Sequence, residues 1–160
     1  MKSLNALVIS DSHGDAKAVK TLINNLSSVI NAVIFLGDHN TDILPLARAN
    51  HKKLLYHIVN GNNDYQMAEF GERVIDFGGV KIFITHGHRY GSEDRLAYKA
   101  LELGVIAVCF GHTHVGYCGE VNGVSLINPG SLRLPRNGAS RSYAILRAEN
   151  GRLNYKLAKL

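Results

Sequence analysis

The chain has 160 residues, of which 46% are hydrophobic and 19% are charged. This composition is typical of a soluble globular protein, and the length suits one domain with its own core, which we expect over residues 1–160. The formal charge of +5 permits an anionic partner but identifies none, because lysines and arginines are spread along the chain. No apolar run approaches the ~20 residues of a membrane-spanning helix, so we expect no membrane partner.

Two cysteines, Cys109 and Cys118, form no Cys-x-x-Cys pair. Cys109 stands in the apolar run "VIAVCF" and is expected to be a small buried hydrophobic residue. The opening segment "LNALVIS" is too short for a signal peptide and is followed at once by Asp11. The sequence therefore predicts a reducing, cytoplasmic location.

The first half of the chain alternates strand-like and helix-like patterns. Apolar residues at helical spacing follow Asp15, which is expected to cap that helix, and Pro45 lies in or near the first turn of a short helix. Alternating strands and helices predict right-handed crossovers and a largely parallel sheet. The expected strands are residues 6–10, 32–37 and 54–59, and the short helix is 42–50.

The second half is rich in hairpins. Residues 73–85 indicate a hairpin around Gly78-Gly79, and the pairs Asn122-Gly123 and Asn150-Gly151 each separate alternating runs. Between them lie a helix with Ser92 as its N-cap and the strand "VIAVCFG". We therefore predict an α/β fold in which two mixed β-sheets pack face to face, flanked by α-helices in a four-layer sandwich.

Five apolar runs are each followed directly by Asp, Asn or His residues, and six of the eight histidines stand at these places. Each motif alone has an ordinary explanation as a turn or a helix cap. Together they predict one shared site, because the carboxyl ends of parallel strands meet in one crevice. The five motifs are Asp11-Ser12-His13, Asp38-His39-Asn40, Asn62-Asn63-Asp64, His86-Gly87-His88 and His112-Thr113-His114.

Carboxylate, imidazole and amide ligands without thiolate suit Mn, Fe, Zn, Ni or Co better than a structural zinc site. If the backbone is extended, Asp11 and His13 share a face, as do His112 and His114. Two ions that share Asp38 can use all seven candidates, and paired ions ~3.5–4 Å apart suit in-line phosphoryl displacement. The candidate ligands are Asp11, His13, Asp38, Asn62, His86, His112 and His114.

The order of these motifs, from residue 8 to about residue 131, resembles that of the calcineurin-like metallophosphoesterases. The His86-Gly87-His88 form and "INPGS" look most like the small prokaryotic phosphodiesterase branch of that family. The resemblance implies the two-sheet fold and two divalent ions, with Mn favoured. One ion would be held by Asp11, His13 and His114 and the other by Asn62, His86 and His112, with Asp38 as bridge and a hydroxide between the ions as nucleophile.

Some residues near the motifs have roles that the sequence leaves open. His88 either faces the substrate or supports a ligand, or it is an ordinary loop residue, and the same holds with less weight for His39. Asn128 and Ser131 either shape the rim of the site or form a plain turn. The loop arginines Arg133, Arg136 and Arg141 either contact substrate phosphate or are solvated.

One position departs from the wider family, in which a histidine thought to protonate the leaving group stands between the asparagine and the aspartate. Here that position is Asn63, whose amide cannot act as a general acid. Asp64 then has no histidine to orient. The catalytic candidates are Asp38, Asn62, Asn63, Asp64 and His88.

The resulting hypothesis is a phosphodiesterase for small or activated diesters. The alternatives are a phosphomonoesterase or a nuclease on the same site, or a scaffold module resembling a retromer subunit that has lost part of its ligand set. Nucleic acid is disfavoured, because no basic stretch interleaved with aromatic residues is present. The natural substrate and a homo-oligomeric state stay open.

Overall fold

The structure is a computed structural model that describes residues 3–65 and 71–160. Ten strands, three α-helices and one 3₁₀-helix occur in this described part. In chain order they are β1 (Leu4–Ile9), α1 (Ala16–Leu26), β2 (Ala32–Phe35), η1 (Asn40–Asp42), α2 (Leu44–Ala49), β3 (Leu55–Ile58), β4 (Glu72–Phe77), β5 (Val80–Thr85), α3 (Glu93–Leu103), β6 (Ala107–Cys109), β7 (Gly116–Val121), β8 (Val124–Pro129), β9 (Ser142–Glu149) and β10 (Arg152–Lys159).

The strands form two mixed sheets, as the sequence predicts, and each sheet has five strands. The first has the order β10-β9-β1-β2-β3, in which β1, β2 and β3 are parallel neighbours and β9 and β10 run antiparallel. The second has the order β4-β5-β6-β8-β7, in which β5, β6 and β8 are parallel. The parallel strands of each sheet therefore end at one edge, where the sequence places its polar motifs.

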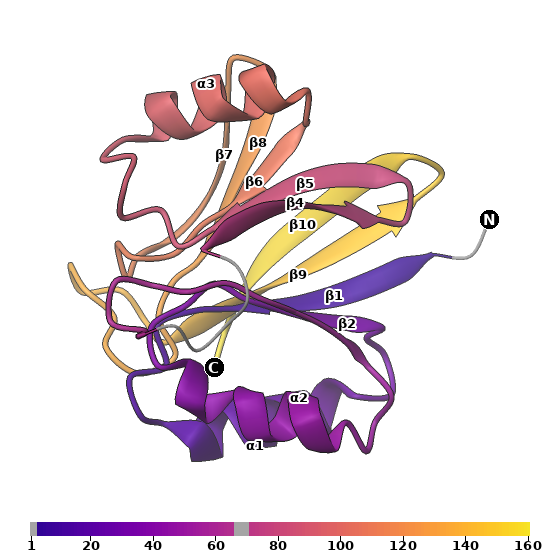
Figure 1. Cartoon of the computed structure of the whole chain (residues 1–160), viewed down its shortest axis with the longest axis vertical. Coiled ribbons are helices and arrows are strands. Elements are labelled where there is room, and N and C mark those ends of the chain that lie inside the picture. Colours follow the sequence, from indigo (N-terminus) through magenta and orange to yellow (C-terminus); the bar gives the residue numbers. More distant parts are fainter. Residues whose placement is uncertain (1–2, 66–70) are drawn as a thin grey trace.

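The two sheets pack face to face, with α1 and α2 under the first sheet and α3 over the second (Figure 1). Successive side chains of β1 point to opposite faces of the first sheet, which explains this layering. Ala6 and Val8 lie in the apolar core between the sheets, whereas Leu7 and Ile9 lie in the core against α1. A strand buried on both faces reads as a continuous apolar run, which is the pattern found at β1 and β2.

The local signals for turns and caps are confirmed. Asp15 accepts a hydrogen bond from the Ala18 amide at the start of α1, and Ser92 accepts one from the Arg95 amide at the start of α3. The Asn122-Gly123 and Asn150-Gly151 pairs have positive φ at both residues and connect β7 to β8 and β9 to β10. Among the described residues, the helices are all too short to cross a bilayer.

Candidate metal centre

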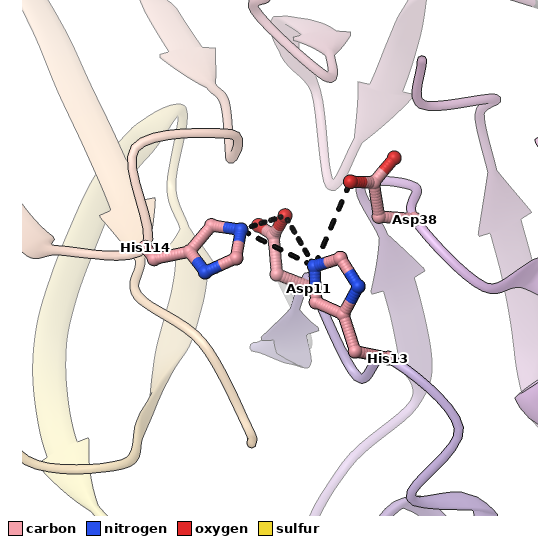
Figure 2. A group of neighbouring side chains, drawn as sticks. All are labelled: Asp11, His13, Asp38 and His114. Carbon is pink, nitrogen blue, oxygen red and sulfur yellow. Dashed lines mark hydrogen bonds and ion pairs between the residues drawn. The ribbon is translucent and has the colours of Figure 1, made fainter. Parts of the chain in front are cut away.

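Four side chains from three separate motifs meet at the edge where the parallel strands end (Figure 2). Each offers one ligand atom, and these atoms all lie within 4.8 Å of one another. Figure 2 shows the ring nitrogens of two histidines directed at one carboxylate. The group consists of Asp11, His13, Asp38 and His114.

The Asp38 carboxylate lies between the other members of this group and a second pair of histidines, His86 and His112. Its Oδ2 is 3.6 Å from His13 Nε2, and its Oδ1 is 3.5 Å from His86 Nε2. The rings of His86 and His112 are 5.2 Å apart, and the His112 amide donates to Asp11 Oδ2 over 3.1 Å. Six of the seven predicted ligands thus converge, with Asp38 central: Asp11, His13, Asp38, His86, His112 and His114.

The expectation of extended backbone at the paired motifs is wrong. Asp11 and His13 have φ of 54° and 43°, and His112 and His114 have φ of 69° and 61°. Asp38 is also left-handed, with φ of 63°. Non-glycine residues rarely adopt this conformation, and its occurrence at five candidate ligands marks local strain of the kind that gathers at functional sites. Tight left-handed turns, rather than a shared strand face, direct these side chains inward.

Two glycines let the ligand loops approach one another closely. A Cβ on Gly61 would stand 2.1 Å from Asp38 Oδ1, and a Cβ on Gly111 would stand 2.1 Å from Ser10 Oγ and 2.9 Å from Asp11 Oδ2. None of these three distances is available to a real Cβ, so only glycine allows both carboxylates to keep their positions.

Backbone carbonyls fix the tautomers of two histidines. His86 Nδ1 lies 2.7 Å from the Leu36 oxygen, and His114 Nδ1 lies 2.7 Å from the Leu134 oxygen. Because a carbonyl only accepts, each Nδ1 carries a proton, and Nε2 is the nitrogen that faces the centre and is available to a cation. A backbone partner on the remote nitrogen is the usual arrangement for a metal-binding histidine.

The inward-facing atoms lack the partners that a metal-free site would need. His86 Nε2 and Asp11 Oδ1 are buried and accept no hydrogen bond within the described chain. His114 Nε2 lies 3.1 Å from Asp11 Oδ1 and 3.2 Å from His13 Nε2. Lone pairs facing one another at these distances repel unless a cation or a proton lies between them. The residues therefore fit a divalent cation.

The clustered side chains shift one another's pKa values. Burial acts to raise the pKa of Asp11, but the closely approaching rings of His114 and His13 outweigh it and hold that pKa below its ordinary range. The contact with Asp11 raises the pKa of His114, whereas burial and the charge of His86 lower that of His112. Asp11 is thus an ionised carboxylate, as a metal ligand must be.

The motif after β3 differs from expectation in one respect. Asn62 is exposed, and within the described residues its side chain makes no hydrogen bond to the centre. Asn63 contacts Asp38 instead, donating from Nδ2 to Oδ2 over 2.7 Å and from its amide to Oδ1 over 3.0 Å. Asp64 accepts from the amides of Asp38, Asn40 and Gly61 at 2.7, 2.7 and 2.8 Å. Asp64 therefore fixes the loop that carries Asp38.

The remaining candidates surround this centre. The ring of His39 lies tilted beside that of His13, with ring centroids 5.1 Å apart. The ring centroid of His88 lies 5.5 Å from that of His86, and burial and then the charge of His86 lower the pKa of His88. Asn128 is buried and donates to the oxygens of Gly111 and Thr113, so it supports the loop of His112 and His114.

Sequence reasoning missed several buried supports. Asp42 accepts from the Ser12 hydroxyl at 2.7 Å and from the Gly14 amide at 2.9 Å, which holds the loop of Asp11 and His13 in its turn. Ser10 donates to Asp11 Oδ2 over 2.6 Å. Ser10 stands next to Asp11 in the sequence, but the contact between Ser12 and Asp42, 30 residues apart, is fixed only by the fold.

The sandwich and its carboxylate–histidine centre are the fold and the kind of site found in metal-dependent phosphoesterases. Residues 4–151 match the family model described as the calcineurin-like phosphoesterase superfamily domain, and the chain belongs to this family. The chain is 37% identical over 151 residues to the probable metallophosphoesterase YsnB of Bacillus subtilis (strain 168), covering 92% of this chain and 86% of that protein. It is also 33% identical over 66 residues to the phosphodiesterase YfcE of Escherichia coli K12, covering 41% of this chain and 34% of YfcE.

Solved structures show the same fold. The crystal structure of a predicted phosphoesterase from Streptococcus pneumoniae TIGR4 superposes with a TM-score of 0.82 at 26% identity, over 99% of this chain and 91% of that one. Zinc-complexed Vps29 from Entamoeba histolytica superposes with a TM-score of 0.72 at 24% identity, over 97% and 98% of the two chains. The second likeness concerns the fold alone.

Proposed function

We propose that this metallophosphoesterase is a phosphodiesterase that hydrolyses small or activated diesters with two divalent ions. The observation that carries the proposal is the central place of Asp38, whose two carboxylate oxygens face histidines on opposite sides. One aspartate between two donor sets is the arrangement that a pair of ions requires. The wider proposal is that residues 1–160 form a single domain of this family, which the match over residues 4–151 supports.

The proposed ligands form two sets. Asp11, His13 and His114 would hold one ion, and His86, His112 and Asn62 would hold the other, with Asp38 shared. Asn62 is exposed and makes no competing hydrogen bond in the described chain, so its amide oxygen is available as a ligand. We propose Mn as the favoured metal, with Ni, Fe, Zn and Co as alternatives that the same oxygen and nitrogen ligands accept.

When bound, paired ions activate a water molecule and stabilise the attacking and leaving oxygens of an in-line displacement. The chain's own residues keep the ligand atoms in position. Hydrogen bonds to Asp38 from Asn63 and to Asp64 from the loop amides hold the central carboxylate. Carbonyl contacts to His86 and His114 keep their Nε2 lone pairs directed inward.

The lack of a proton donor at Asn63 determines which diesters we expect to be good substrates. Asn63 occupies the place where relatives carry a proton donor, and an amide has no titratable proton. A general acid typically contributes roughly 10²–10⁴-fold. Diesters whose leaving groups need no protonation, such as nitrophenyl esters, should therefore be cleaved best.

The test is hydrolysis of bis-p-nitrophenyl phosphate by purified protein loaded with Mn²⁺ or Ni²⁺. Nitrophenolate release should require the metal and should fall to background in Asp38→Ala. The proposal is wrong if the metal-loaded protein releases none, or if Asp38→Ala cleaves the diester undiminished. Parallel assays with p-nitrophenyl phosphate and single-stranded nucleic acid test the phosphomonoesterase and nuclease alternatives.

The scaffold alternative predicts a damaged ligand set. Six candidate ligands converge in this chain, which favours the enzyme. Metal analysis of protein purified without chelator separates the two: about two ions per chain at saturating Mn²⁺ support the enzyme, and fewer than one would favour the scaffold. Cys109 and Cys118 are free thiols, and we propose a cytoplasmic, reducing location on that basis.

A further inference from the structure

One loop, residues 131–136, is hydrogen-bonded to all three residues of the first proposed ligand set. The Ser131 hydroxyl donates to the Asp11 oxygen over 2.8 Å, and Arg133 Nη1 donates to the His13 oxygen over 3.3 Å. His114 is held from both sides, because its Nδ1 donates to the Leu134 oxygen and its own oxygen accepts from the Arg136 amide over 3.2 Å. The loop therefore forms the rim of the centre on this side.

The loop and its continuation carry three arginines, and two of them have partners. Arg141 pairs with Asp15 over 2.8 Å and donates to the Leu132 oxygen, and Arg133 donates to His13 as described. The guanidinium of Arg136 makes no hydrogen bond or ion pair within residues 3–65 and 71–160. Its side chain is exposed, although its main chain is fixed to His114.

Arg136 lies beside the centre through its main chain. Its amide donates to the oxygen of His114, a proposed ligand two residues from His112, which is assigned to the other ion. Asp15, the acidic residue in contact with the continuation of this loop, already pairs with Arg141. An exposed, unpaired guanidinium on a loop that is hydrogen-bonded to a phosphoryl-binding centre is suited to a phosphate oxygen.

We propose that Arg136 binds a second phosphate of the substrate, so that the preferred substrates are phosphodiesters carrying a further phosphate group on one ester arm. The inference rests on the phosphodiesterase proposed above and deepens it by naming a substrate class. Arg136 is then a specificity-determining residue, and it takes no part in the displacement itself. A diester without the second phosphate leaves this guanidinium in water.

The experiment compares two chromogenic diesters that differ only in that phosphate. The first is thymidine 5′-(p-nitrophenyl phosphate), and the second is the same compound with a 3′-phosphate. Both release nitrophenolate, so leaving-group chemistry is identical and the ratio of their kcat/KM values reports the second phosphate alone. We expect the wild-type protein to favour the 3′-phosphorylated ester about tenfold or more, as a charge-assisted hydrogen bond to phosphate allows.

Arg136→Ala should bring this ratio close to one, and Arg136→Lys should restore part of it, since lysine keeps the charge but not the two-pronged geometry. The matched control is Arg89→Ala. Arg89 is also exposed and without a hydrogen bond or ion pair in the described chain, but it lies beside His88 on the other side of the centre. Its loss removes the same unit of charge and should leave the ratio at the wild-type value.

Three results would overturn the inference: a wild-type ratio near one, an unchanged ratio in Arg136→Ala, or an equal fall in Arg89→Ala, which would indicate a general field rather than a contact. Failure of the wild-type protein to release nitrophenolate from either ester would instead refute the proposed function. The two failures are thus distinguishable in one set of assays.

Discussion

Asp64 gives the sharpest test of how the centre is held together. Its carboxylate accepts three backbone amides, with Oδ2 receiving those of Asp38 and Gly61 and Oδ1 receiving that of Asn40. In Asp64→Asn one of these oxygens becomes an NH₂ group that cannot accept, so at least one amide loses its partner. Asp64→Ala removes the acceptor for all three.

The burial and the hydrogen bonds of Asp64 determine how large the loss of stability should be. Asp64 is half-buried, so water can reach some of the orphaned amides, and each lost hydrogen bond is expected to cost about 1 kcal/mol. The free energy of unfolding of metal-free protein should fall by about 1 kcal/mol in Asp64→Asn and by about 3 kcal/mol in Asp64→Ala. Loss of such support typically weakens metal binding by roughly 10–100-fold, because the loop of Asp38 is released.

Urea unfolding and calorimetric Mn²⁺ titration measure the two effects. Asp76→Asn is the control, since Asp76 accepts a single amide, that of Gly79, in the β4–β5 hairpin away from the centre. It should leave Mn²⁺ affinity unchanged. If Asp64→Asn lost turnover while its unfolding free energy and Mn²⁺ affinity stayed at wild-type values, Asp64 would act directly on the substrate and the reasoning would be refuted.

Three further changes have defined outcomes. Asn63→His should raise turnover of diesters with poor leaving groups more than that of nitrophenyl esters, and equal effects in steady-state assays would contradict a proton-donor role at this position. Gly111→Ala should reduce Mn²⁺ binding by tenfold or more in titrations because of the close contacts described above, whereas Gly71→Ala, which meets nothing within 4 Å, should bind normally. Burial, aided by the charge of Arg73, lowers the pKa of His57 below its unfolded value of about 6.5, so the unfolded chain binds the proton more readily. Stability should therefore be complete above about pH 6.5 and decline as the pH falls through the folded pKa, and His57→Gln should flatten this dependence in urea melts at several pH values.

The fold could be predicted because its signals are local. An Asn-Gly pair between alternating runs specifies a hairpin. Asp15 and Ser92 mark the starts of helices independently of the rest of the chain. The meeting of the polar motifs was also predictable, since parallel strands end at a common edge.

Details of the centre were beyond sequence reasoning because they depend on contacts between distant segments. The Nδ1 partner of His114 is a carbonyl 20 residues away, and that of His86 is 50 residues away. The left-handed backbone at Asp11 and His13 could not be predicted from residue type, since the supports from Asp42 that accompany it come from another loop.

The left-handed turns have a consequence for protein engineering. An L-residue in this conformation typically costs roughly 1–2 kcal/mol, and Asp11, His13, Asp38, His112 and His114 all adopt it. A free peptide with any of these motifs would relax to a right-handed or extended shape and aim its side chains elsewhere. Transplanting the five motifs onto a foreign sheet would therefore not transplant metal binding. The minimal transferable unit also includes the glycines that allow close approach and the side chains that hold the turns, namely Asp42, Asp64 and Asn128.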